Sequence, residues 1–224
     1  MPPPPEAVSS PAGTAPAALP TTERGRRMRA RLLAAAREVF ERDGFLEARV
    51  TDISAAAGVA HGSFYTYFGS KTAVFRALVA ETMDDLYASM GTRHEPGPPD
   101  GSPEEVAVHR IDRANRRFVD TYLQNTALMA LFEQVTTFDP EVRALRQAAR
   151  ERTVGRVRHS IEQLQRDGLV AADLDAEYSA HALVAMVNGL VHYWLVLDGE
   201  FEQERLVAAL TRLWAQALGL PVRT

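Results

Sequence analysis

The sequence contains no cysteine, which excludes disulfides and thiolate metal sites and is typical of a protein in a reducing compartment. It also lacks a Gly-x-Ser-x-Gly elbow, a phosphate-cradling glycine loop and a dinucleotide fingerprint, so its motifs give little support to an enzyme. The N-terminal residues carry neither the basic start nor the apolar run of a secretory signal, and no segment is expected to span a bilayer. We therefore predict a cytoplasmic protein with no membrane partner.

Positive charge is scarce overall but unevenly placed. The formal net charge is -4, yet residues 21–71 contain nine basic and six acidic residues, and the remainder of the chain is acidic. The basic residues are arginines except for Lys71. A basic segment on an acidic body favours a nucleic-acid-binding head, because phosphates attract the first and are repelled by the second.

The composition predicts three segments and an all-α fold. Residues 1–22 are rich in proline and alanine and are expected to be a disordered tail. Residues 23–70 are predicted to form a three-helix head and residues 71–220 a larger helical bundle; the features described below predict DNA binding by a helix-turn-helix in the head, and ligand binding and dimerisation in the bundle. Apolar residues recur at helical spacing throughout, with no alternating strand pattern, and the chain is long enough to bury a substantial core.

The most informative segment runs from Thr51 to Lys71 and has the pattern of a helix-turn-helix. Thr51 is expected to cap a first helix, Gly58 to supply the positive-φ backbone of a tight turn, and residues 61–67 to form a second helix. Ser70 is expected to cap a third helix that begins at Lys71. The second helix would then lie in the major groove and present a short polar surface, made of His61, Gly62, Ser63, Tyr65 and Thr66.

These residues resemble the helix-turn-helix of the TetR/AcrR family of transcription regulators. The match is carried by nine positions, namely Ile53, Ala57, Gly58, Val59, Gly62, Tyr65, Tyr67, Phe68 and Lys71. Two positions depart from the family pattern: Ala60 stands where Ser or Thr usually caps the recognition helix, and His61 where Lys or Arg is frequent. The resemblance implies phosphate contacts from Thr51, Tyr67 and Lys71. For the tyrosines, packing into the core is the alternative.

The helix predicted over residues 176–197 is apolar around nearly its whole circumference, and the helix over 202–218 carries an apolar stripe. A helix that is apolar all round must be buried on every side, which a second copy of the chain would achieve. The family resemblance also implies a homodimer; a core helix within a monomer is the alternative. The predicted dimer residues are Leu183, Val187, Leu190, Val191, Trp194, Leu210, Leu213 and Trp214.

Other body helices carry aromatic, soft and polar residues suited to a small-molecule site. The predicted lining is Phe118, Tyr122, Met129, Phe132, Glu133, Asn188 and His192. The polar stripe of His181, Asn188 and His192 must find partners, either in a ligand or in the dimer mate, and the sequence does not distinguish them. Arginines between Arg143 and Arg158 are interpreted as a solvated helix face. The resemblance implies an effector that is often apolar.

Together these features predict a ligand-responsive regulator that binds a palindromic double-stranded DNA operator as a homodimer and is released by a small, largely apolar effector. Repression is the expected sign of regulation. The sequence predicts no cofactor and no metal site, because the pairs Glu105/His109 and Glu177/His181 are equally typical of solvated ion pairs. A helical enzyme or metal-binding protein is the alternative function.

Overall fold

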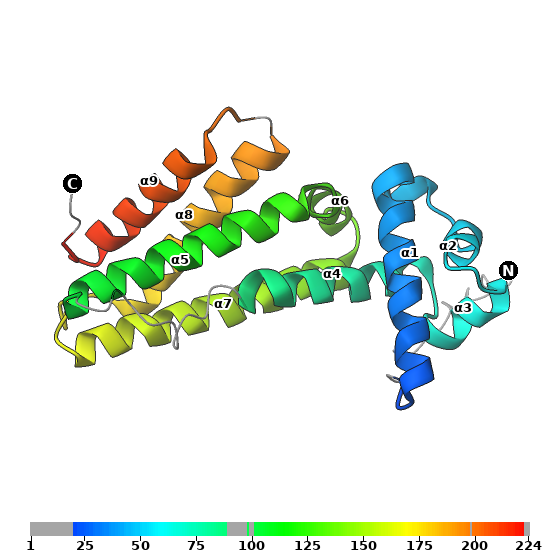
Figure 1. The fold of residues 1–224 in the computed structure, drawn as a ribbon, viewed down its shortest axis with the longest axis horizontal. Helices are drawn as coiled ribbons and strands as arrows, with labels where there is room; N and C mark the ends of the chain where they lie inside the picture. The colour runs from blue at the N-terminus through cyan, green and yellow to red at the C-terminus, as the bar shows by residue number, and fades with distance from the viewer. Residues whose placement is uncertain (1–19, 89–97, 99–100, 198, 222–224) are drawn as a thin grey trace, which may run out of the picture. The chain divides into compact units, whose positions relative to one another are not determined.

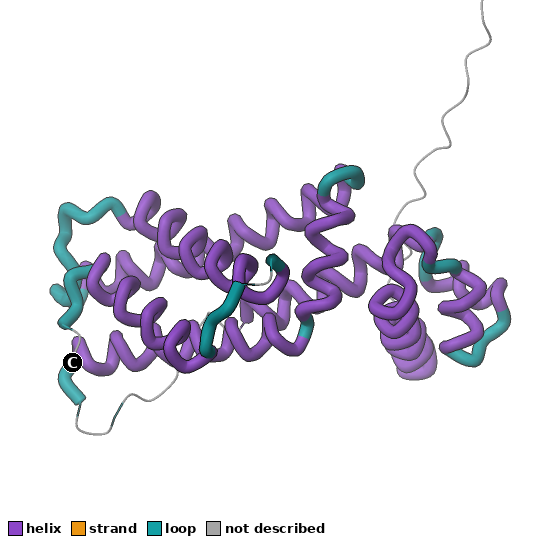
Figure 2. Tube along the Cα trace, turned by 90° about the horizontal axis from the view of Figure 1, so that it is seen from above, coloured by secondary structure: helices purple, strands orange, loops and turns teal. Residues whose placement is uncertain are grey.

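The computed structural model describes residues 20–88, 98, 101–197 and 199–221. Within these residues the chain is all-α, with no strand (Figures 1 and 2). It divides into two compact units, residues 1–77 and residues 78–224, which we call the head and the body. The helix bounds are α1 (Glu23–Glu47), α2 (Val50–Ala56), α3 (His61–Tyr67), α4 (Lys71–Ala88), α5 (Pro103–Gln124), α6 (Thr126–Thr136), α7 (Pro140–Arg166), α8 (Ala176–Val196) and α9 (Gln203–Ala217).

The helix α4 begins in the head and continues into the body. The functional boundary expected at residue 70 stays a prediction. Most of the tail expected over residues 1–22 lies outside the described residues. The glycine and proline residues of segment 91–101 also predict a loop, and most of that segment lies outside the described residues.

The head is held by an aromatic cluster where α1 meets α4. Phe40, Phe45 and Phe75 have ring centroids 4.9 to 5.7 Å apart, and all three are buried. Gly44 lies between two of these phenylalanines with φ 77°, a backbone conformation that glycine adopts at little cost. The kink there turns Phe45 into the core. The glycine predicts that the first helix ends at Gly44, but α1 is only kinked there and continues for one more turn to Glu47.

The sequence predicts body helices over residues 103–125, 126–137, 140–167, 176–197 and 202–218. The observed helices match these ranges to within one residue at each end, because their termini are specified locally. Ser102 forms a capping box with Glu105 at the start of α5, and Asp139 accepts hydrogen bonds from two backbone N–H groups of α7. Within the body, α8 packs along α7 and α9 packs along α5. The core between them includes Phe118, Phe132 and Leu210.

Candidate DNA interface and effector pocket

The turn between α2 and α3 is fixed by backbone contacts and by one arginine of α1. Gly58 has φ 62°, and the N–H of Val59 donates to the carbonyl of Ser54 at 3.0 Å. The Arg31 guanidinium donates to the carbonyl of Ala57, the last residue before the turn. The predicted helix-turn-helix is therefore present, with its turn tied to the longest helix of the head.

Packing holds α3 in place. Its N-cap, Ala60, makes no side-chain hydrogen bond to the first turn, which agrees with the missing cap noted in the sequence. Phe64 is fully buried and its ring lies 5.8 Å from that of Phe68, which is 4% exposed. The Arg29 guanidinium lies over the Phe68 ring at 5.4 Å. These contacts anchor one side of α3 in the head.

The opposite side of α3 is open. His61, Gly62, Tyr65 and Thr66 are exposed, and Ser63 is half-buried. The Tyr65 ring is 49% exposed and packs edge-on against His61, with centroids 5.3 Å apart. All five residues predicted for the major groove thus lie beside one another on a short helix, while their contacts with DNA stay a prediction.

Two of the residues assigned to phosphate have different surroundings from those expected. Thr51 does not cap α2; the helix begins at Val50, with the N-cap at Arg49, two positions before the predicted cap, and the exposed Thr51 hydroxyl lies 3.4 Å from Asp52. An exposed hydroxyl in the first turn of a helix remains available to a phosphate. Tyr67 is half-buried, which also leaves its predicted role open.

Lys71 closes the end of α1. Its ammonium donates to the carbonyls of Phe45, Leu46 and Ala48 at 2.7, 2.9 and 2.9 Å, which accounts for all three of its hydrogens. Desolvation by burial lowers the pKa of Lys71, and the carboxylate of Glu47 opposes this shift. The sequence did not predict this role. A lysine at the start of α4 gives no sign in the sequence that it donates hydrogen bonds to the carbonyls at the end of α1. A phosphate contact would require at least one of these hydrogen bonds to be replaced.

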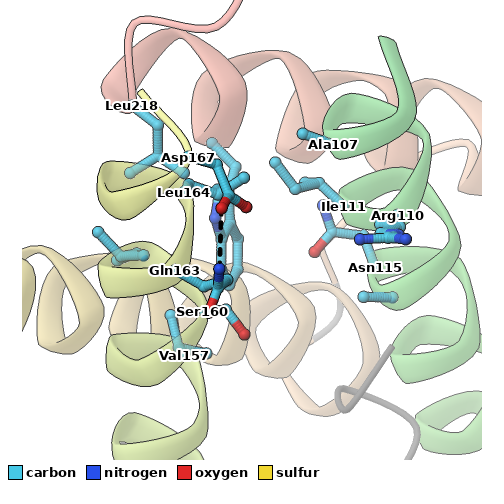
Figure 3. Close-up of a pocket in the computed structure, with 13 residues that line it drawn as sticks. Ala107, Arg110, Ile111, Asn115, Val157, Ser160, Gln163, Leu164, Asp167 and Leu218 are labelled. Carbon is cyan, nitrogen blue, oxygen red and sulfur yellow. Dashed lines mark hydrogen bonds between the residues drawn. The ribbon is translucent and has the colours of Figure 1, made fainter. Parts of the chain in front are cut away.

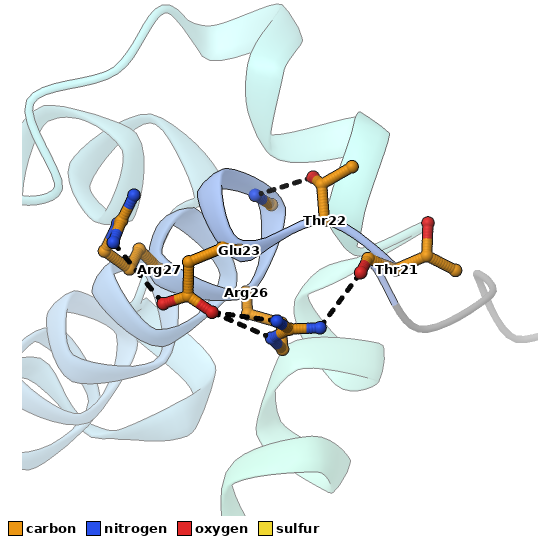
Figure 4. A network of polar contacts seen from close by, with 6 residues as sticks. Thr21, Thr22, Glu23, Arg26 and Arg27 are labelled. Atoms are coloured by element: carbon orange, nitrogen blue, oxygen red, sulfur yellow. Dashed lines mark hydrogen bonds and ion pairs between the residues drawn. The ribbon is translucent and has the colours of Figure 1, made fainter.

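The arginines at the start of α1 divide between surface ion pairs and structural contacts. The carboxylate of Glu23 lies 2.8 Å from the Arg26 guanidinium and 3.4 Å from that of Arg27, and Arg26 also donates to the carbonyl of Thr21; Figure 4 draws these contacts. Exposed pairs of this kind contribute little stability. The basic segment of the sequence is thus a partly neutralised surface.

The body contains a cavity of roughly 220 Å³ that gathers most of the predicted ligand residues. Six of the seven line it, namely Tyr122, Met129, Phe132, Glu133, Asn188 and His192. The seventh, Phe118, is fully buried beside Tyr122 and belongs to the core, so its assignment to the lining is corrected. Helices α4 to α8 all contribute to this cavity, which we call the effector pocket.

Sequence reasoning missed two arginines of the effector pocket. Arg146 and Arg150 of α7 line it, and Arg146 pairs with Glu133 at 2.7 Å. Both are exposed, so the predicted solvated face of α7 is present, and its edge reaches this cavity. Their spacing of four residues on one helix was the available signal, since such residues share a face. The pocket is consequently more polar than its aromatic residues alone indicated.

The polar stripe on α8 divides between two environments. Asn188 and His192 line the effector pocket, and His192 Nδ1 lies 3.3 Å from the Tyr122 hydroxyl. His181 lies outside it, 3.4 Å from Glu177, which also accepts a hydrogen bond from Arg158 at 2.7 Å. That hydrogen bond is the main reason why the pKa of Glu177 is lowered. Two of the three residues therefore line the cavity, and their contact with a ligand stays a prediction.

The dimer residues predicted on α8 and α9 are mostly part of the chain's own core. Leu183, Val187, Val191 and Leu210 are at most 4% exposed, and Trp214 is 9% exposed, so these five face neighbouring helices of the same chain. Leu213 is half exposed, and Leu190 and Trp194 are partly exposed. Sequence periodicity cannot separate the two sides of a helix that is apolar on both.

The expectation that no segment could span a bilayer needs correction. By length and composition alone α8 passes such a test, with a mean hydropathy of 1.2, although 28% of its most apolar window is buried in the chain. Its packing along α7 accounts for the buried part.

Among the described residues, no cluster of three or more metal-binding side chains is found.

Both the head and the body resemble known protein families. Residues 32–78 match the family described as "Bacterial regulatory proteins, tetR family", and residues 107–219 match "BetI-type transcriptional repressor, C-terminal". The second match spans half of the chain. The chain belongs to the TetR family. It is therefore a DNA-binding transcription regulator, not an enzyme, and like other members it binds operator DNA as a homodimer and responds to a small molecule.

Individual relatives agree with this assignment. The HTH-type transcriptional regulator TtgR of Pseudomonas putida is 27% identical over 184 residues, covering 79% of this chain and 84% of its own. The HTH-type regulator YdgC of Bacillus subtilis is 29% identical and covers 85% and 92%. Among solved structures, Salmonella enterica GusR has a TM-score of 0.70 at 20% identity, covering 89% and 98%, which shows the shared fold.

Proposed function

We propose that this TetR-family protein is a repressor that binds a palindromic operator through α3 of each subunit and is released by a small effector. The observation that carries the proposal is the division of α3 into a buried side and an exposed side. Phe64 and Phe68 hold it in the head, and His61, Tyr65 and Thr66 project from it. Repression is supported by related repressors, which include BepR of Brucella suis and the BetI-type repressors whose C-terminal family residues 107–219 match.

The exposed residues of α3 restrict how DNA is read. None of them is an arginine, asparagine or glutamine, the side chains that form bidentate contacts with guanine or adenine. We propose that His61, Ser63 and Thr66 contact base edges, and that Tyr65 packs near the backbone or a thymine methyl. Specificity then depends substantially on DNA shape and bridging water. Gly62 lets the backbone of α3 approach the groove closely, and Thr51 and Tyr67 are proposed to contact phosphates.

The effector pocket supports a ligand with an apolar part and at least one polar group. Met83, Met129 and Phe132 form apolar surface, whereas Arg150, His192 and the Arg146–Glu133 pair provide charge and hydrogen bonds. A volume near 220 Å³ suits a small molecule of one or two rings. This refines the expected, largely apolar effector by adding a polar anchor.

The helix α4 offers a route between effector and DNA. Its first residue, Lys71, is bonded to the end of α1, and its residue Met83 lines the effector pocket. We propose that ligand binding favours a position of α4 in which the two heads no longer fit successive major-groove segments. The ligand must bind this conformation more tightly than the DNA-bound one, since only a difference in affinity shifts the equilibrium.

The exposed face of α8 is the best candidate for the dimer interface. Tyr178, Ala182, Ala185, Gly189 and Tyr193 are exposed and follow one another at intervals of three or four residues. Small residues at the centre would allow close approach of a second α8, and the tyrosines would pack at its ends. Leu190, Trp194 and Leu213 remain in the proposed interface as partly exposed neighbours. A regulator of this kind acts in the cytoplasm, where operator DNA is accessible.

The proposed function is tested by titrating the full-length protein into fluorescent DNA from the region flanking its own gene, at two salt concentrations. We expect anisotropy to report specific binding that competitor DNA of scrambled sequence does not displace, and whose affinity falls as salt rises. Binding of equal strength to both sequences would contradict an operator-specific regulator. Adding the protein to a promoter transcribed in vitro gives the sign of regulation.

A further inference from the structure

A second cavity lies in the body between α5, α7 and α9, and it shares no residue with the effector pocket. Its volume is roughly 140 Å³. In Figure 3, Arg110, Ile111 and Asn115 of α5 line one wall, and the facing wall holds Ser160 and Leu164 of α7 and Asp167, the residue that follows this helix. The lining also includes Trp214 of α9 and Leu218, the residue that follows α9. We call this space the α5/α7/α9 cavity.

The α5/α7/α9 cavity contains an unsatisfied hydrogen-bond donor. Of the buried side-chain nitrogen and oxygen atoms in the described residues, Nε of Arg110 alone lacks a hydrogen-bond partner. Buried donors are almost always paired, because desolvation without a partner is costly. An orphaned guanidinium nitrogen therefore indicates a missing acceptor at this position.

The other polar groups of the cavity do not fill that role. Asp167 accepts a hydrogen bond from Gln163 of α7 at 2.9 Å and is exposed, while the Ser160 hydroxyl donates to the carbonyl of Arg156. Asn115 is 1% exposed and its amide donates to Thr211 of α9 at 3.3 Å. These groups are committed to helix and interhelix contacts, and Arg110 is left for a group from outside the chain.

The remaining lining is apolar. Ile111, Val157, Ile161 and Leu164 provide aliphatic surface, and Trp214 provides an aromatic wall. An apolar cavity of about 150 Å³ is large enough to hold a benzene ring. A ligand that satisfies both features has one ring, or a short branched chain, and one anionic group at Arg110.

We propose that the α5/α7/α9 cavity is a binding site for a small monocarboxylate, with its carboxylate on the Arg110 guanidinium and its apolar body against Trp214 and Ile161. A carboxylate matches the planar fork of arginine and forms charge-assisted hydrogen bonds with it. The carboxylate of Asp167 across the cavity disfavours a dianion such as phosphate. Because the effector pocket has its own lining, both sites can be occupied at once.

The site is tested with benzoate as the probe, by isothermal titration calorimetry on the full-length protein at pH 7 without DNA. Benzamide has nearly the same shape but no charge, so it serves as the matched ligand. We expect benzoate to bind the unaltered protein at least about tenfold more tightly than benzamide, since a charge-assisted hydrogen bond is lost with the amide. Absence of benzoate binding, or equal affinity for the two compounds, would overturn the proposal.

Two variants and a control locate the site. Arg110→Met keeps an apolar stem and should weaken benzoate binding about tenfold while changing benzamide binding little. Arg113→Met removes an exposed arginine one turn along the same helix and should leave both affinities unchanged. Ala114→Phe fills the cavity and should abolish binding of both ligands. Unchanged benzoate binding in Arg110→Met or in Ala114→Phe would place the anion elsewhere and contradict the proposal.

The outcome does not depend on operator binding. If the variants do not fold, which thermal unfolding would show, the comparison of benzoate with benzamide on the unaltered protein still decides whether a carboxylate is recognised. If the protein binds benzoate but no operator, the carboxylate site is supported and the proposed function is contradicted. If it binds an operator but no benzoate, the proposed function is supported and the carboxylate site is contradicted.

Discussion

The short helices α2 and α3 of the head and the long helices α5, α7 and α8 of the body are stabilised in different ways. In the body, α5, α7 and α8 are 21 to 27 residues long, and each begins with a side chain that accepts hydrogen bonds from its first turn. In the head, α2 and α3 are seven residues long and neither has a side-chain cap. Isolated helices of that length are not stable in water. The proposed recognition helix α3 is therefore stabilised mainly by the packing of Phe64 and Phe68 in the head.

This difference has a functional consequence. The exposed side of α3 contributes less to the head than the buried side, because Phe64 and Phe68 are buried while Tyr65, whose ring lies 5.4 Å from that of Phe64, is half exposed. Residues on the exposed side can then change and alter DNA preference without loss of the fold. In the body, by contrast, many exposed polar side chains have structural contacts, because they cap helices or form ion pairs.

The largest expected effect comes from removing the anchor of α3. Phe64→Ala should lower the free energy of unfolding by about 3 to 5 kcal/mol, because it leaves a cavity at a fully buried site. It should also abolish operator binding. Chemical denaturation at fixed protein concentration measures the first effect and anisotropy the second.

The matched control for this change is Phe138→Ala in the body, where the ring is 50% exposed. It should change stability by about 1 kcal/mol or less. Similar losses for the two phenylalanines would show that α3 is not held by burial of Phe64.

The second prediction concerns the closure of α1 by Lys71. Lys71→Met removes three hydrogen bonds to backbone carbonyls and should cost about 1 to 3 kcal/mol of stability. The salt dependence of operator binding, measured well below the unfolding temperature, should stay the same if the ammonium remains bonded to α1 in the complex.

The control is Arg24→Met, which removes an exposed positive charge from the same unit and should leave stability within about 0.5 kcal/mol. A salt slope that flattens by about one unit in Lys71→Met would show instead that Lys71 contacts a phosphate.

A smaller effect is expected from the capping box of α5. Ser102→Ala removes the hydroxyl that accepts from the Glu105 N–H and should lower stability by about 1 kcal/mol, with unchanged operator affinity. Thermal unfolding followed by circular dichroism measures this change. A loss of operator binding that exceeds the loss of folded protein would contradict the separation between body caps and DNA reading.

The smallest effect sharpens the comparison by adding the side-chain cap that α3 lacks. Ala60 occupies an extended N-cap conformation with φ -65° and ψ 142°, which suits a serine. Ala60→Ser should raise the stability of the protein by about 0.5 to 1 kcal/mol, because its hydroxyl can accept from the first turn of α3. Ala34→Ser, at an exposed interior position of α1, should be neutral or slightly destabilising. Equal effects of the two serines would show that no cap forms at Ala60.

The sequence predicted most of the fold because the signals for it are local. Ser102 and Asp139 mark the starts of α5 and α7, and Gly168 marks the end of α7. The helix-turn-helix follows from a fixed pattern of residues around Gly58. Most of the predicted effector-pocket residues also lie together, since aromatic and polar residues stand out against an apolar background.

What the sequence missed depends on contacts between distant segments. The carbonyls that Lys71 satisfies lie 23 to 26 positions away along the chain, and no periodicity reports such a contact. The buried side of α8 cannot be separated from its exposed side, because both are apolar. The unpaired Nε of Arg110 becomes visible only when α5, α7 and α9 are brought together.

The central claim, that the exposed side of α3 reads DNA, is tested most directly with one triple variant. The change His61→Ala, Tyr65→Ala and Thr66→Ala removes the exposed side chains and leaves Phe64 and Phe68 in place. Anisotropy with the protein's own operator should show at least a hundredfold weaker specific binding, on the order of 1 kcal/mol per side chain. The melting temperature should stay nearly unchanged. Specific binding of full strength by this folded variant would contradict the account.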